Sequence, residues 1–332
     1  EHYERHLCEI EALVGKRINP GSSDQVAQLL FRDLKLQLPG GQVILTATGQ
    51  QSTDADTLNL LLPAHPVVKP ILDARGVAKL KDTYADKLPR MISREDGRLR
   101  TTLRQDVPRT ARLSSEDPNL QNIPIRDELG REIRAAFIAS PGCVLGGCDL
   151  SQIEMVWAGE LSQDQIILEV FRHKMDMHVR TACAIFGLDN QEVQSLWRMY
   201  KRGELPDTEI EWIRNFELNK RLPSKTAGFA ILYGTTAGGL RIQIVSAGGP
   251  LFSEDYCQHQ FIDRFFHEFH GLAAWMEQQH TRARRFGMVW NPFGRIRLIP
   301  EAQSPVRSIV SEGLRKSGNT PIQSAAGDHL KI

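Results

Sequence analysis

Several features that would assign a chain to a class at once are missing from these 332 residues. No apolar run approaches about 18 residues, the length of a membrane-spanning helix, so we expect no membrane partner. Lys and Arg number 41 against 40 Asp and Glu, which leaves a net charge of +1 and no global attraction to nucleic acid. Hydrophobic residues make up 41% and charged residues 24%, which excludes a disordered or collagen-like chain. The length predicts about two domains, or one large domain with several lobes.

Cysteine is scarce, and the five cysteines contain no CxxC pair. Scattered thiols indicate a reducing compartment, in which we expect most of them to be small core residues. The GxxxxGKS/T phosphate loop, GxGxxG, HExxH and GxSxG are also absent, which argues against the common nucleotide-loop proteins, zinc proteases and serine hydrolases. The chain begins at Glu1 without a signal-peptide pattern, so we expect a piece of a longer polypeptide.

Hydrophobic periodicity divides the chain into helical and extended segments. We expect helices over 1–35 with a break at 19–22, over about 66–88, over most of 152–285, and over 304–318. We expect strands over 99–102 and 144–148, a strand-turn-strand piece over 288–300, and a loop or short hairpin over 38–53. Helices, a sheet, a large helical insertion and a return to the sheet predict a multi-lobed α+β fold.

A carboxylate follows the predicted strand over 144–148. Asp149 would be held rigidly at the end of that strand, which suits a hard cation such as Mg²⁺ that binds one or two carboxylates plus substrate phosphates. Glu154, five residues further on, would lie in the first turns of the next helix. Alternatively, Asp149 only caps that helix, and single Asp residues at strand ends are common.

A second candidate site lies in the segment from Arg221 to Gly234. Pro223 is tolerated only in a first turn, so the helix should begin near residue 222. Lys225, Phe229 and Tyr233 then share one face at i, i+4 and i+8. Cations at the start of a helix favour an anion, and aromatic rings further along could stack on a base or sugar, as a nucleotide would require. The alternative is an amphipathic core helix with two solvated cations.

The third candidate is a basic segment over 278–300, which contains no acid and five arginines interleaved with aromatic residues. Such a pattern is typical of contacts with a nucleic-acid backbone. The alternative is a solvated helix end beside a few core aromatics. The residues concerned are Arg282, Arg284, Arg285, Arg295 and Arg297, with Phe286, Trp290 and Phe293.

Several blocks of the sequence, in order, resemble those of the bacterial DNA polymerase I family (family A). The blocks are 79–84, 111–115 with 117–124, 149–154 with 161–164 (motif A), 176–178, 221–234 (motif B) and 319–326. Because they cover nearly the whole chain in the family's order, a chance match is negligible.

The resemblance implies a right-hand polymerase fold of class α+β with an antiparallel palm sheet. Residues 1–90 would form the thumb, 91–152 the first part of the palm, 153–299 the helical fingers with an insertion at about 191–216, and 300–332 the return to the palm. The chain would stop before motif C, the His-Asp-Glu turn that carries the second metal-binding carboxylate. We therefore expect a C-terminally truncated palm, with motif C on a missing segment or on a separate chain.

The activity that the resemblance implies is template-directed addition of dNTPs to a primer 3′ end, with two Mg²⁺ ions. Asp149 would be a catalytic metal ligand, with the Leu150 carbonyl as a further ligand. Lys225 would be catalytic as the proton donor to pyrophosphate. Primer–template DNA and dNTPs would be the partners. The implied location is the cytoplasm of a bacterial or phage-infected cell.

Site residues also follow from the resemblance. His178, Arg221 and Lys225 would hold the triphosphate, Phe229 would pack on the sugar and base, Tyr233 would occupy the templating position, and Glu154 would be the steric gate against a ribose 2′-OH. With Gln152 these form the implied nucleotide-binding set. The implied DNA-binding residues are Lys81, Arg112, Asn119, Gln121, Asn122, Asn319 and Gln323.

The sequence departs from the family's pattern at four positions. Leu150 stands where Tyr is usual, Val156 where Arg is usual, Ala111 where Gly is usual, and Gly228 where Asn or another polar residue is usual. The departures and the insertion indicate a divergent phage or metagenomic lineage. Two other functions stay open: a non-catalytic primer–template binder, and a family A polymerase for lesion bypass or RNA templates.

Overall fold

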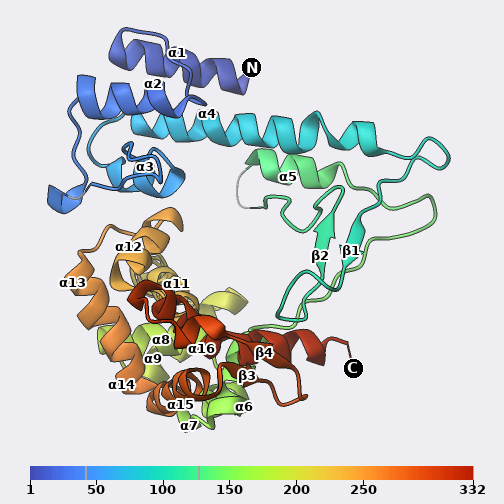
Figure 1. The fold of residues 1–332 in the computed structure, drawn as a ribbon, viewed down its shortest axis with the longest axis vertical. Coiled ribbons are helices and arrows are strands. Elements are labelled where there is room, and N and C mark those ends of the chain that lie inside the picture. Colours follow the sequence, from blue (N-terminus) through green and yellow to red (C-terminus); the bar gives the residue numbers. More distant parts are fainter. Residues whose placement is uncertain (42, 126–127, 332) are drawn as a thin grey trace. The chain divides into compact units, whose positions relative to one another are not determined.

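The computed structural model describes residues 1–41, 43–125 and 128–331, which fall into two compact units (Figure 1). The first unit comprises Glu1–Val107 and Leu113–Cys148, and the second comprises Pro108–Arg112 and Asp149–Ile332. Helices dominate both units and each contains a short antiparallel strand pair, in agreement with the predicted α+β class. None of the helices in the described part combines the length and apolar character that crossing a bilayer requires. The thumb, palm and fingers boundaries stay predictions.

The first unit is built on two long helices, with α1 packed along α4 (Figure 1). Ser22, at the predicted break, caps the second helix by accepting a hydrogen bond from the Gln25 amide at 3.4 Å. The elements of this unit are α1 (His2–Val14), α2 (Ser23–Ala27) continued by a π-helical turn (Gln28–Asp33), a 3-10 turn (Pro39–Gly41), α3 (Ala55–Leu61), α4 (Val68–Leu80) continued by a π-helical turn (Lys81–Ala85), a 3-10 turn (Leu88–Met91), β1 (Thr102–Arg104), β2 (Ser114–Glu116) and α5 (Glu128–Ala135).

The strand predicted over 144–148 is wrong. These residues lie outside every strand that the structure describes, and Val144 and Leu145 are 92% and 70% exposed. A strand needs a neighbour for its backbone hydrogen bonds, and among the described residues the sheet of β1 and β2, with Leu103 opposite Ser115, has only these two strands. Residues 144–148 pair with neither of them, so Asp149 does not lie at the end of a strand.

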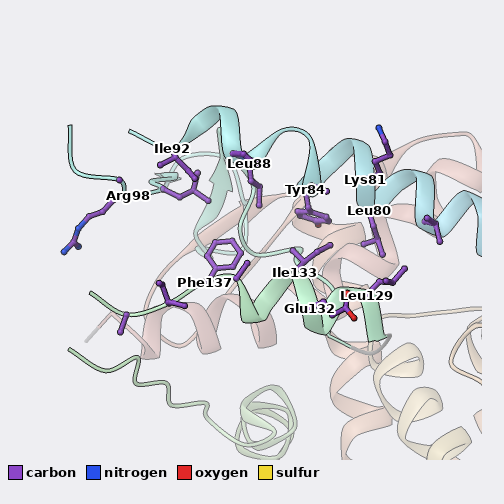
Figure 2. Close-up of a pocket in the computed structure, with 18 of the residues that line it drawn as sticks. Leu80, Lys81, Tyr84, Leu88, Ile92, Arg98, Leu129, Glu132, Ile133 and Phe137 are labelled. Carbon is purple, nitrogen blue, oxygen red and sulfur yellow. The ribbon is translucent and has the colours of Figure 1, made fainter. Parts of the chain in front are cut away.

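An apolar cavity of about 1170 Å³ opens in the first unit, and the sequence pattern gave no sign of it. Figure 2 shows Leu80, the last residue of α4, and Tyr84 of its π-helical extension facing Leu129 and Ile133 of α5 and Phe137 just after it. None of the predicted nucleotide-binding residues lines this cavity.

The second unit places α11 in the middle of a helical cluster, where α8 and α12 pack against it. Phe261, Phe265 and Phe269 are fully buried in the same core as Ala227 and Ile231 of α11. The elements are α6 (Ile153–Ser162), α7 (Gln165–Arg172), α8 (Met177–Phe186), α9 (Asn190–Arg202), α10 (Asp207–Phe216), a π-helical turn (Glu217–Arg221), α11 (Leu222–Leu232), α12 (Ala237–Ser246), α13 (Glu254–Tyr256), a π-helical turn (Cys257–Asp263), α14 (Arg264–Glu268), α15 (His270–Phe286), β3 (Met288–Trp290), β4 (Ile296–Leu298), a 3-10 turn (Pro300–Gln303) and α16 (Arg307–His329).

Two local predictions need correction. The last helix does not end near 318 but continues through Pro321 to His329, because its C-terminal half is almost wholly buried and tertiary packing outweighs the proline. Of the cysteines, Cys183 and Cys257 are buried as predicted, and burial raises the pKa of the Cys183 thiol to about 12. The other three, Cys8, Cys143 and Cys148, are exposed rather than core residues.

Candidate functional site

The first turns of α11 carry the cation that the sequence predicted, but α11 is not a separate helix. The backbone stays helical from α10 through the π-helical turn at 217–221, and Arg221 has φ −69° and ψ −44°. The prediction that a helix begins near residue 222 is therefore wrong, although Pro223 does lie in the first turn of α11. Lys225 is exposed, and Phe229 and Tyr233 are half-buried further along the helix. The cation and the two rings therefore follow one another at intervals of four residues along this helical segment.

His178 lies against α11 from the start of α8. Asp176 caps α8 by accepting hydrogen bonds from the amides of His178 and Val179 at 2.8 and 2.9 Å. The His178 ring, 7% exposed, lies 5.5 Å from the Phe229 ring between centroids. Two segments about fifty residues apart thus bring a histidine onto the predicted nucleotide-binding face.

Burial, reinforced by the charges of Arg221 and Lys225, lowers the pKa of His178 to about 4, against the opposing charge of Asp176. His178 is therefore neutral near pH 7 and can both donate and accept one hydrogen bond. A bound polyphosphate would favour the protonated ring.

Asp176 and Arg221 form a largely buried ion pair. Arg221 Nη2 lies 2.7 Å from Asp176 Oδ2, and the two side chains are 14% and 19% exposed. Burial alone would raise the pKa of Asp176, but the charge and hydrogen bond of Arg221 and the cap amides outweigh it, so this pKa lies below its ordinary value. Arg221 Nε is buried without a partner among the described residues. The guanidinium is thus held through Nη2, and its other N–H donors can still bind a ligand.

A second cluster joins three predicted residues from three parts of the chain. Glu154, in the first turn of α6 and 6% exposed, accepts hydrogen bonds from the Arg112 guanidinium and from the Tyr233 hydroxyl at the end of α11. Gln152 caps α6 with φ 54°, and its Oε1 is buried without a partner in the described part of the chain. The predicted steric gate Glu154, the predicted templating-position residue Tyr233 and one predicted DNA-binding residue, Arg112, therefore form one hydrogen-bonded group.

Close backbone approaches to α16 hold this cluster in place. A Cβ on Gly327 would lie 2.9 Å from the Thr110 carbonyl oxygen, so only glycine lets the segment before Arg112 approach the helix so closely. Ala111 in that segment has φ 64°, a left-handed conformation that favours the glycine usual at this position.

Asn319 and Gln323 stand four residues apart on α16, hence on one face. Arg315, one turn before Asn319, packs on Gly234 directly after Tyr233. Asn319 Oδ1 is buried and unpartnered within the described residues. This face of α16 therefore lies beside the Tyr233 end of α11.

The basic segment over 278–300 is less free than its composition indicated. Arg295 pairs with Asp328 at 2.7 Å, and Arg297 donates to Thr320 at 2.8 Å, so both tie the β3–β4 hairpin to α16. Arg282 lies over the Trp290 ring at 4.6 Å. Acids outside the segment thus compensate two of its five arginines: Asp328, 33 residues further along the chain, pairs with Arg295, and Glu277 pairs with Arg284 at 3.4 Å.

The remaining predicted residues are exposed or form contacts within their own unit. Asp149 is exposed, as is Leu150 at 43%. In the first unit, Asn119 and Gln121 order their own loop, since Gln121 bonds to the Ser115 amide and the Leu113 carbonyl. There, too, Tyr84 donates to the Asn122 carbonyl, and Lys81 pairs with Asp86.

Comparison with a sequence model of a known protein family identifies the family of this chain. The sequence model of "DNA polymerase family A" matches residues 1–202 and 209–332. The chain belongs to DNA polymerase family A. Only residues 203–208, which comprise the connection after α9 and the first two residues of α10, are left unmatched by this family's model.

Relatives of this family A chain are similar over its whole length. It is 38% identical over 330 residues to the thermostable DNA polymerase I of Thermus filiformis, covering 99% of this chain and 36% of that protein. It is 35% identical over 320 residues to DNA polymerase I of Pseudomonas aeruginosa, covering 96% of this chain and 31% of that protein. The chain thus spans about a third of the length of these curated relatives.

A solved relative has the same fold. The POL domain of Pol1 from M. smegmatis, in complex with DNA primer-template and dNTP, superposes with a TM-score of 0.79 at 31% identity. The match covers 99% of this chain and 52% of that one. The polymerase fold predicted from the resemblance is therefore confirmed.

Proposed function

We propose that this chain binds an incoming deoxynucleoside triphosphate at the start of α11 and takes part in template-directed extension of a DNA primer. The observation that supports this most directly is the meeting of α8 with α11, which joins His178, Arg221 and Phe229 near the exposed Lys225. A triphosphate needs cations for its phosphates and a flat apolar surface for its sugar and base. This part of the second unit offers both.

The partners that we propose are dNTPs and primer–template DNA. The M. smegmatis domain that this chain resembles was solved with both, which supports the same pairing here. Arg112 is half-exposed at 51% even while it is paired with Glu154, so its guanidinium has surface left for a nucleic-acid ligand. Glu154 as steric gate, Tyr233 at the templating position, and Lys81, Asn119, Gln121, Asn122, Asn319 and Gln323 as DNA contacts remain part of this proposal.

The proposed cofactor is Mg²⁺, two ions in the reaction as a whole. No group of three His, Cys, Asp or Glu side chains in the described ranges is close enough to hold a metal by itself. Mg²⁺ commonly takes one or two carboxylates and completes its shell with substrate phosphates, and the exposed Asp149 with the Leu150 carbonyl fits one such ion. The chemistry that the bound ions supply is charge neutralisation on the phosphates and activation of the primer 3′ oxygen.

The chain's own residues would do the positioning in this reaction. Arg221 and Lys225 would bind the phosphates, and neutral His178 would add a hydrogen bond. Lys225 is exposed and therefore accessible to a leaving pyrophosphate, to which its ammonium would donate a proton. Phe229 would pack on the sugar and base.

Primer extension by the protein that carries this sequence tests the proposal. We expect Asp149→Asn to slow extension by about 10³-fold or more, since it removes a charged metal ligand, with primer–template affinity within about twofold. Lys225→Ala should slow extension by about 10²-fold as a lost proton donor. Exposed residues of the same unit serve as matched controls: Glu211→Gln for the carboxylate and Lys174→Ala for the lysine.

The two functions separate in one experiment. Mg²⁺-dependent extension that is insensitive to Asp149→Asn would reject Asp149 as the metal ligand. DNA and dNTP binding without any extension would leave the non-catalytic primer–template binder as the function of this protein.

A further inference from the structure

Helix α9 makes polar contacts with the residue that holds Arg221. The Gln194 side chain is 1% exposed, and its Oε1 accepts from the Asp176 amide at 3.0 Å while its Nε2 donates to the Asp176 carbonyl at 2.8 Å. One side-chain amide therefore satisfies both backbone groups of Asp176. A buried amide gains no stability over an apolar residue unless it is paired in this way, so its placement depends on Asp176.

Trp197, one turn further along α9, contacts both partners of the ion pair. Its Nε1 donates to Asp176 Oδ2 at 3.1 Å, the same oxygen that Arg221 Nη2 contacts at 2.7 Å. Its ring lies under the Arg221 guanidinium, 4.3 Å from the carbon to the ring centroid. Trp197 thus restrains Arg221 in two ways. Its ring stacks on the face of the guanidinium, and its N–H holds the Asp176 carboxylate that pairs with the edge of the guanidinium.

Apolar packing explains only part of this arrangement. Trp197 belongs to a small core with Val179, Ala182, Val193 and Ile213, which accounts for the burial of its ring. Burial alone would be met by Leu or Phe at this position. The indole N–H on Asp176 and the paired Gln194 amide are the features that packing does not require.

We propose that α9 orients Arg221 for the triphosphate, with Trp197 and Gln194 as positioning residues; this rests on the proposed function. Both lie within 191–216, the segment predicted to be an insertion. Arginine side chains carry much rotamer freedom, and a guanidinium that is already oriented loses less of it on binding phosphate. The stacked and paired Arg221 therefore binds the phosphates at a lower entropic cost.

The test is steady-state extension of a primer–template by the whole protein, with KM for the dNTP and kcat measured separately. We expect Trp197→Leu, which removes both the ring and the N–H, to raise KM by about 10-fold, with kcat and primer–template affinity within about twofold. Trp197→Phe keeps a ring face under Arg221 and loses the donor, so we expect a rise of about threefold. Gln194→Met, of similar size and without hydrogen bonds, should also raise KM.

The matched control is Trp212→Leu and Trp212→Phe in α10. Trp212 lies in the same segment, stacks on Phe216 at 5.5 Å and has no contact with Asp176 or Arg221 among the interactions described. These variants should leave KM unchanged. A merely structural role for Trp197 would lower the active fraction, and thus kcat, without raising KM.

Arg221→Ala in the same assay separates the two ideas. If Arg221→Ala leaves KM for the dNTP unchanged, the proposed nucleotide site is wrong. If Arg221→Ala raises KM while folded Trp197→Phe and Gln194→Met do not, the site stands and the positioning role of α9 is overturned. Circular dichroism confirms folding, and the conservative variants keep the test valid if Trp197→Leu unfolds.

Discussion

Two polar regions of the molecule differ in how they are held. The polar cluster of Asp176, His178, Gln194, Trp197 and Arg221 draws its members from the start of α8, from α9 and from the residue before α11, and hydrogen bonds and one ring contact link them. Asp149 lies instead in the exposed run over 141–150. A side chain that several distant segments contact has its position fixed by them, whereas an exposed carboxylate has only its own backbone to place it.

The strongest test of this contrast removes one charge from each region. We expect Arg221→Met to lower the free energy of unfolding of the second unit by about 2–4 kcal/mol, because it leaves the carboxylate of Asp176 largely buried without its cation. Asp149→Asn, at an exposed position, should change it by less than about 0.5 kcal/mol. Urea unfolding followed by tryptophan fluorescence reports this unit, since all five tryptophans lie in it.

Similar losses in the two variants would contradict the contrast. Asp176→Asn combined with Arg221→Met should recover part of the lost stability, because it removes the unpaired charge as well.

A pH series tests the burial of His178 in the polar cluster. Its folded pKa of about 4 lies below the ordinary 6.5, so between these values the unfolded chain binds a proton that the folded chain does not. Stability should therefore be full above pH 6.5 and decrease as pH falls toward 4, by at most about 3.5 kcal/mol at about 1.4 kcal/mol per pKa unit. Asp176 affects the free energy of unfolding at lower pH. Its pKa is lowered from 3.8 in the folded chain, so the stability that the charged carboxylate contributes is lost only as pH falls below 3.8.

His178→Asn should flatten the pH dependence of the unfolding free energy in this window. The control has the opposite sign: exposed His259, hydrogen-bonded to Asp263, has a raised pKa, so its contribution is present below 6.5 and lost as pH rises through the folded pKa. An unchanged slope in His178→Asn would show that the ring is protonated in the folded protein.

The end of α11 offers a smaller test in the second unit. Gly234 has φ +71°, and a Cβ there would lie 2.7 Å from Arg315 Cγ and 3.3 Å from Arg315 Cα. Gly234→Ala should therefore destabilise the unit by about 1–3 kcal/mol through backbone strain and displacement of α16. Because Tyr233 precedes it, the same variant should disturb the bond to Glu154. In urea unfolding, Arg315→Ala in the same background should restore only part of the loss, since the backbone of residue 315 stays equally close.

Part of the structure could be predicted from local sequence patterns. The hairpin in 288–300 and the cap at Ser22 follow from residues close to each other in the sequence, and the structure has both. The helix start near 222 was wrong, because the helix is continuous with α10 through the π-helical turn at 217–221. The strand over 144–148 was wrong for the complementary reason: an apolar run is local, but a strand's partner is not. Whether a run pairs cannot be read from the run itself.

The candidate site likewise contains residues that the sequence predicted and residues that it did not. Lys225 and Phe229 were predicted by helical spacing and by resemblance, and Arg221 by resemblance. Gln194 and Trp197 were missed, because they reach Asp176 from 18 and 21 residues away and neither residue type signals such a contact. An amphipathic helix with one buried polar position would have been the only sequence signal.

The smallest expected effect compares two glycines of the α11 region. A Cβ on Gly228 would meet Phe265 Cε2 at 3.9 Å and Thr181 Cγ2 at 4.0 Å, which is ordinary van der Waals contact. Gly228→Ala should therefore stabilise the second unit by about 0.5–1 kcal/mol, because glycine in a helix interior is less favourable than alanine by that amount. Urea unfolding against Gly234→Ala, six residues on, gives opposite signs if the space around each glycine decides the outcome. Destabilisation by Gly228→Ala would show instead that the packing of α11 against Phe265 and Thr181 has no room for a methyl group, so that the space around Gly228 does not decide the outcome as the distances indicate.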